Sequence, residues 1–257
     1  MADRCLTNRS MNKKNRYIVA ISILVMLVLW ELVSLRVDSE QILPGPWTTL
    51  LATLQLFCEK GFLLTVCNTI LRGFIGFAMA LVLGLVLGVL AGLRSGFAAF
   101  MRPWIVVMRS IPVVAFILLA LIWLRSGSVP VFIGFLTMFP LIFTNVVEGI
   151  LNVDKKLVDM AQCYQVSQRR IVREVYIPAI APFVFSGVSS AFGIGWRAIV
   201  IGEVLSQPEY GIGTQMHAAQ TFLNVDVLIA WTLVAILISF LFERLIRLVE
   251  KLIIKWK

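Results

Sequence analysis

The chain has 257 residues, of which 60% are hydrophobic and only 14% are charged, and its formal net charge is +9. A soluble domain carries about a quarter charged residues, so this composition indicates an integral membrane protein and gives no reason to expect a nucleic-acid partner. The four cysteines include no C-x-x-C pair and the single histidine is His217, which argues against a metal site. The sequence also offers no nucleophile–base pair of the kind that an enzyme needs.

Six apolar runs follow one another along the chain, and each is long enough for a bilayer, which requires about 20 residues. They are Tyr17–Leu35, Phe62–Leu93, Trp104–Leu124, Val129–Ile150, Ile177–Leu205 and Val225–Val249. The first run is too long for the apolar core of a typical signal peptide, so we interpret it as a retained span. We expect an all-α integral membrane protein, with one transmembrane domain over residues 17–250 between short tails at 1–16 and 251–257.

The segments outside the first two spans carry signals of their own. Leu43-Pro44-Gly45-Pro46-Trp47 opens an amphipathic run to Lys60, which predicts a short helix on the external interface, because proline is tolerated in a first helical turn. In the second span, Gly84, Gly88 and Gly92 recur every four residues and predict a groove for a closely packed helix. The last external loop, 206–224, either dips back toward the membrane or caps the mouth of the bundle.

The distribution of basic residues predicts the orientation. Most of the 23 Lys and Arg residues lie in the two tails and in the loops after the second and fourth spans. The alternate loops hold only Arg36, Lys60 and Arg125. Because basic residues collect on the cytoplasmic side, we expect both termini and the loop at about 151–176 to be cytoplasmic.

That cytoplasmic loop is polar but has helical periodicity. Leu157, Val158, Ala161 and Tyr164 have the spacing of one apolar helix face, and a second helical patch begins at Gln168. The pattern predicts a pair of short helices that fits a groove on a soluble partner.

The same loop resembles the cytoplasmic signature of the binding-protein-dependent ABC importer permeases, which reads E-A-A, three residues, G, nine residues, I-x-L-P. Asp159-Met160-Ala161 fall at the first three positions, and Val175, Ile177 and Pro178 fall at the I, L and P. Gln165 stands at the glycine position. This glutamine is the largest departure from the signature, and we expect it to affect the turn between the two short helices.

Further elements are similar to the nitrate, sulfonate, taurine and bicarbonate subfamily. Leu43-Pro44-Gly45-Pro46 resembles its L-P-S-P element, and Arg109-Ser110-Ile111-Pro112 resembles R-P-I-P. Leu121–Leu124 resembles I-L-W-F, and Gly195–Ala198 with Glu203-Val204 and Gly211-Ile212-Gly213 resembles the W…E-M…G-x-G region. Their common order and spacing identify the chain as similar to this subfamily over nearly its whole length.

The resemblance implies a type I ABC importer transmembrane domain in the bacterial plasma membrane. Two permease copies, expected to form a homodimer, would enclose the pathway, an external binding protein would deliver substrate, and two ATP-binding subunits would hold ATP and Mg. The residues expected to couple to those subunits are Asp159, Met160, Ala161, Tyr164, Gln165, Arg169, Arg170, Ile177 and Pro178. The chain has no G-x-x-x-x-G-K-[ST] phosphate loop, which agrees with hydrolysis in another polypeptide.

Polar and proline residues within the spans predict the pathway. They are Asn68, Arg72, Arg109, Pro112, Trp196, Arg197 and Glu203. Arg197 lies midway along its span, where a charge costs about 2.5–3.5 kcal/mol, so it either lines the pathway or is a structural partner of Glu203 or a carbonyl. Glu203 is either a gate residue or a solvated helix end. Arg109 is expected near the cytoplasmic end of the third span, where it could simply snorkel.

The substrate stays open at this point. The subfamily favours a small anion such as a sulfonate, taurine, nitrate or bicarbonate, whereas related permeases carry pyrimidine-type vitamin precursors or riboflavin. An ATP-independent channel or carrier is the remaining alternative, although it gives the cytoplasmic helix pair no purpose.

Overall fold

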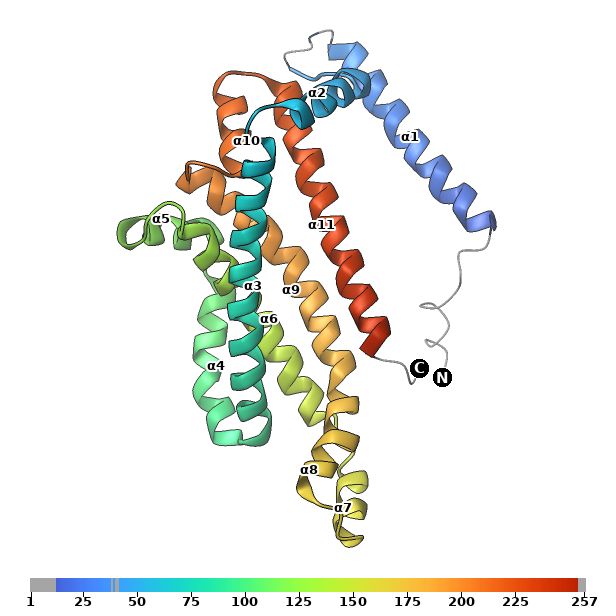
Figure 1. The fold of residues 1–257 in the computed structure, drawn as a ribbon, viewed down its shortest axis with the longest axis vertical. Helices are drawn as coiled ribbons and strands as arrows, with labels where there is room; N and C mark the ends of the chain where they lie inside the picture. Colours follow the sequence, from blue (N-terminus) through green and yellow to red (C-terminus); the bar gives the residue numbers. More distant parts are fainter. Residues whose placement is uncertain (1–12, 38, 40–41, 254–257) are drawn as a thin grey trace.

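The computed structural model describes residues 13–37, 39 and 42–253, and every regular element within them is helical (Figure 1). Residues 1–12 and 254–257, which belong to the predicted tails, lie outside the described residues. In chain order the helices are α1 (Lys13–Val37), α2 (Pro46–Cys58), α3 (Phe62–Leu93), α4 (Ser95–Ser110), α5 (Val113–Trp123), α6 (Val129–Leu151), α7 (Lys155–Cys163), α8 (Gln168–Ile171), a π-helical turn (Val172–Tyr176), α9 (Ile177–Ser206), α10 (Ile212–Thr221) and α11 (Val225–Ile253). The all-α prediction is confirmed.

Five of the six predicted spans correspond to continuous helices. α1, α3, α6, α9 and α11 are each long and apolar enough to cross a bilayer. Their bounds lie within a few residues of the predicted ones, because a long apolar window marks a membrane helix more clearly than any other local signal. The helix predicted after Pro44 is also confirmed, as α2.

The third predicted span, Trp104–Leu124, is not one straight helix but part of a bent pair, α4 and α5, which together are apolar and long enough for one broken span. α4 begins nine residues earlier, at Ser95, and the chain bends by 99° between α4 and α5. The break lies at Ile111 and Pro112, where Ile111 adopts extended backbone angles (φ −76°, ψ 130°). The ring of a proline disfavours helical geometry in the preceding residue, so Pro112 ends α4.

α6 lies at the centre of the bundle, packed between α3 and α9. The glycine stripe of α3 faces it: a Cβ on Gly84 would lie 2.8 Å from Ile142 Cγ2, and one on Gly88 would lie 2.8 Å from Val146 Cβ. These distances are shorter than any real Cβ contact, so the two helices approach to a separation that only glycine permits. The predicted packing groove is confirmed.

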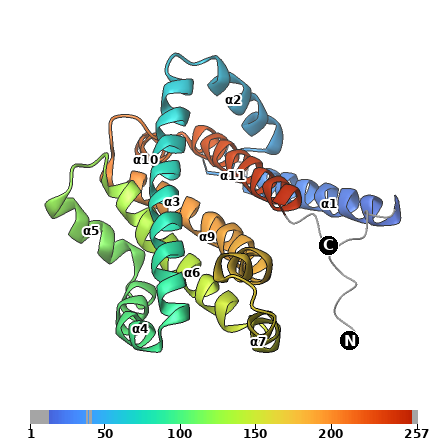
Figure 2. The ribbon, with the colours of Figure 1, turned by 60° about the horizontal axis from the view of Figure 1, so that its bottom comes forward.

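The two ends of the bundle carry different short elements (Figure 1). α2 and α10 lie at one end, and α7 and α8 project from the other. α1 stands away from the bundle, as a second view also shows (Figure 2), and is tied to the segment before α2 by two hydrogen bonds. Trp30 Nε1 donates to Pro44 O at 3.1 Å, and Ser34 Oγ donates to Leu43 O at 2.8 Å.

Candidate functional site

α7 presents an apolar face to solvent at the tip of the predicted cytoplasmic loop. Leu157, Met160 and Tyr164 are 48%, 54% and 79% exposed, and their spacing of three and four residues places them on one side of the helix. Asp154 caps the helix, since its side chain accepts a hydrogen bond from Lys156 N at 2.9 Å. Of the other predicted coupling residues on α7, Asp159 is exposed and Ala161 is half-buried.

Gln165 forms the C-terminal cap of α7 in the backbone conformation that glycine prefers. Its φ is +55°, its N–H donates to Gln162 O, and the N–H of Val166 donates to Ala161 O. These two bonds are the Schellman motif, whose left-handed residue is usually glycine because a Cβ is strained there. The left-handed turn explains why the signature has glycine at this position. This chain keeps the same turn geometry with Gln165 instead of glycine.

The loop returns to the membrane as one unbroken helix. α8, the π-turn and α9 run continuously from Gln168 to Ser206, a stretch of 39 residues. Within the π-turn, the N–H of Ile177 donates to Val172 O, five residues back. Residues 164–167 join α7 to this helix, so the second half of the predicted coupling loop is itself the first part of the helix that continues as α9.

The remaining predicted coupling residues lie along this stretch. Arg169, Arg170 and Ile177 are exposed, and Pro178 is half-buried in the first turn of α9. Arg170 Nε lies 2.9 Å from Glu174 Oε1 in an exposed i,i+4 pair, which is worth little stability in water.

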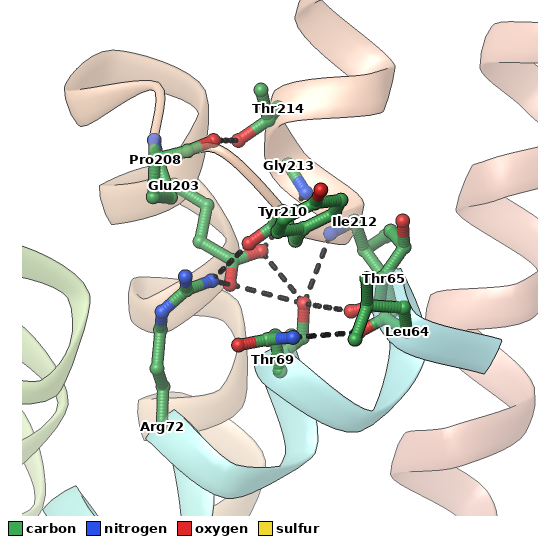
Figure 3. A network of polar contacts seen from close by, with 11 residues as sticks. Leu64, Thr65, Thr69, Arg72, Glu203, Pro208, Tyr210, Ile212, Gly213 and Thr214 are labelled. Carbon is green, nitrogen blue, oxygen red and sulfur yellow. Dashed lines mark hydrogen bonds and ion pairs between the residues drawn. The ribbon is translucent and has the colours of Figure 1, made fainter. Parts of the chain in front are cut away.

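A buried polar network joins three helices near the other end of α9 (Figure 3). The Glu203 side chain is fully buried, and Arg72 Nη1 of α3 lies 2.6 Å from its Oε1. The Thr69 hydroxyl bonds the same carboxylate at 2.9 Å, and the N–H of Gly213 donates to it at 3.0 Å. Arg72 also donates to Tyr210 O at 2.5 Å. The carboxylate therefore has the partners that a buried charge requires.

The network corrects two interpretations of the sequence. Glu203 is not a solvated helix end, and its partner is Arg72 rather than Arg197. Asn68, one turn before Arg72, is half-buried and donates to Leu64 O at 2.8 Å, so it does not join the carboxylate.

Thr69 and Gly213 belong to this network but were not predicted from the sequence. Thr69 stands three residues before Arg72, a spacing that places both on one face of α3. A Cβ on Gly211 would lie 2.7 Å from Glu203 Cδ, which explains the glycine-rich segment before α10. The signal in the sequence that could have indicated this network is the pair Gly211 and Gly213, which follows shortly after Glu203.

α9 has one uncovered stripe that runs from Ser186 to Leu205. Its exposed positions recur every three or four residues, at Ser186, Ser190, Ile194, Arg197, Ile201 and Leu205. The rest of the helix packs against α6, α10, α11 and α3. Arg197 thus projects from a helix of the bundle core into space that the described residues leave open.

Trp196 lines a cavity beside Arg197, and Arg109 lies beside the break between α4 and α5. Trp196 is buried, stacks on Phe192 and donates from Nε1 to Ala235 O at 3.1 Å, so it is a core residue. Arg109 lies in the last turn of α4, next to the break, rather than near the start of a span. There it lines a cavity of about 260 Å³ together with Thr137 of α6 and Ile194 of α9. Arg109 therefore borders the same α9 stripe as Arg197.

Comparison with known proteins agrees with this arrangement of a membrane bundle with an exposed coupling loop. The sequence profile of the binding-protein-dependent transport system inner membrane component matches residues 80–255, which is more than half of the chain. The chain belongs to this family. It is therefore a multi-pass membrane permease component of a transport system.

Individual relatives are similar over most of their length. SsuC of Bacillus subtilis, which carries the name of an aliphatic sulfonates transport permease protein, is 26% identical over 91% of this chain and 85% of its own. The taurine transport system permease protein TauC of Escherichia coli is 24% identical over 90% and 86%. The nitrate import permease protein NrtB of Synechocystis is 28% identical over 91% and 88%.

Proposed function

We propose that this chain is the transmembrane subunit of an ATP-driven importer in a bacterial inner membrane, with both termini cytoplasmic, and that it carries a small anion or aminosulfonate. The names of the relatives support this substrate class, because they refer to sulfonates, taurine and nitrate. They do not favour a pyrimidine precursor or riboflavin.

The observation that carries the proposal is the exposed apolar face of α7, which lies on a loop continuous with α9. Three large apolar side chains on a water-facing helix are stabilised when a partner covers them. An ATP-binding subunit docked there, with ATP and Mg bound to it, would act on α9 through the short turn at 164–167 and the unbroken helix that follows it. Two copies of the permease would require two such subunits.

The α9 stripe supports a pathway shared with a second copy. An arginine facing lipid in the middle of a span is unfavourable by about 2.5–3.5 kcal/mol, so Arg197 requires water, a ligand or a partner chain beside it. A second copy facing the stripe would enclose a pathway that exposes Arg197 and Arg109 to a passing anion. An external binding protein would release substrate at the end that holds α2 and α10.

The test is uptake in vesicles that contain the chain, its ATP-binding subunit and its binding protein. Met160→Glu with Tyr164→Glu places charges on the α7 face, and we expect loss of both co-purification and uptake. The control is Gln162→Glu, which adds a charge to the opposite side of α7 and should change neither. Uptake by the permease alone in ATP-depleted vesicles would instead establish a channel or carrier.

A further inference from the structure

Two adjoining cavities lie in the groove between α9 and α11. They measure about 520 and 390 Å³, and both are lined by Arg197, Ser239 and Glu243. The smaller one is also lined by Ser189 and Ser190 of α9. Both views show α9 and α11 running side by side (Figures 1 and 2).

The groove holds two opposite charges, Arg197 and Glu243, that do not pair with each other. Within the described part of the chain, the ion pairs join Arg72 to Glu203, Arg170 to Glu174 and Arg247 to Glu243, and none includes Arg197. Glu243 uses Oε1 to accept from Arg247 Nη2 at 2.5 Å. Its second oxygen has no protein donor among the described residues. A guanidinium and a carboxylate thus face one space from separate helices without direct contact.

Hydroxyl groups occupy the wall between these charges. Ser189, Ser190 and Ser239 line the smaller cavity, and in the described residues none of their hydroxyls is bonded to protein. A hydroxyl both donates and accepts, so this wall can bind an oxyanion or an ammonium group. The apolar residues Phe192 and Ile194 complete the cavity and suit a short hydrocarbon spacer.

We propose that the α9–α11 groove binds a short zwitterion, with its oxyanion on Arg197 and its ammonium group on Glu243. The inference rests on the proposed importer function and, of the small anions and aminosulfonates proposed there, selects the aminosulfonates. Arginine recognises a sulfonate through two parallel N–H donors, and the carboxylate attracts the ammonium end. The same carboxylate repels a ligand that carries negative charge alone, so Glu243 is a specificity residue and Arg197 a binding residue.

The test compares two probes of nearly equal shape, 2-aminoethanesulfonate and propane-1-sulfonate, which differ by an ammonium group in place of a methyl group. Binding to the purified permease–ATPase complex is measured by saturation-transfer NMR without the binding protein, which removes that protein's own selectivity. We expect the complex to prefer the zwitterion by about fivefold, the size of a favourable solvent-accessible charge pair. Arg197→Gln should weaken binding of both probes.

Glu243→Gln should abolish the preference while binding of propane-1-sulfonate persists or improves. Two controls separate charge from folding: Arg247→Gln breaks the i,i+4 pair but keeps the Glu243 charge, and Glu148→Gln removes an exposed carboxylate of α6. Both should retain the preference.

Equal binding of the two probes by the unaltered complex, or an unchanged preference in Glu243→Gln, would overturn the zwitterion site. Vesicle uptake then separates the two proposals. ATP-dependent uptake of propane-1-sulfonate or nitrate would leave the importer function standing, whereas no uptake of any anion with all partners present would contradict that function as well.

Discussion

At the scale of single residues, the buried Arg72–Glu203 pair has the largest energetic consequence. Glu203 is fully buried and Arg72 nearly so, so removing one charge leaves the other without compensation. We expect Arg72→Gln to destabilise the fold by about 3–5 kcal/mol, measured as a lower thermal unfolding midpoint of the detergent-purified protein. Asn68→Ala, one turn away, loses only a bond to its own helix and should have a small effect. Equal midpoints for both variants would show that the ion pair contributes no net stability.

Gln165 supplies a second prediction, because its backbone is strained for any residue but glycine. Gln165→Gly should stabilise the α7 cap by about 1 kcal/mol, since the left-handed conformation costs a side chain roughly that much. The matched change Gln162→Gly, inside α7, should destabilise the helix by a similar amount. Hydrogen exchange of the α7 amides measures both effects, which must have opposite signs if the cap geometry is as described.

At the scale of elements, the α3–α6 contact depends on the absence of side chains. Gly88→Ala would place a methyl group 2.8 Å from Val146 Cβ, and overpacking of this kind costs about 1–3 kcal/mol. Gly96→Ala, at the start of α4, meets no atom within 4 Å and is the matched control. A lower unfolding midpoint for Gly88→Ala alone would establish the close contact, and equal midpoints would mean that the helices separate without cost.

The elements also show how far sequence reasoning reaches. Phe62–Leu93 and Val129–Leu151 were predictable because each is a long apolar run with flanking polar residues. The 99° bend at Pro112 was harder to predict, because Trp104–Leu124 is apolar apart from Arg109 and Ser110, and hydropathy carries no information on backbone angles. The Arg72–Glu203 pair was not predictable from one sequence, since 131 positions separate its members and helix packing alone brings them together.

At the scale of the whole molecule, native cysteines allow a test of orientation. Cys58 ends α2 and Cys163 ends α7, at opposite ends of the bundle, and both are exposed (Figure 1). With Cys5 and Cys67 replaced by serine, a membrane-impermeant maleimide added to intact spheroplasts should label Cys58. It should label Cys163 only after the membrane is permeabilised. The reverse pattern would place the α7 loop outside and remove the basis for docking an ATP-binding subunit there.

The continuous helix from Gln168 to Ser206 also has a consequence for the importer proposed above. At 1.5 Å per residue, its 39 residues extend about 58 Å, which is nearly twice the hydrocarbon thickness of a bilayer. When a rod of that length tilts about its middle, its two ends move in opposite directions. In that importer, a tilt that widens the bundle on the cytoplasmic side would narrow it on the outer side, so leverage in a single helix would give alternating access with no separate signal between two gates.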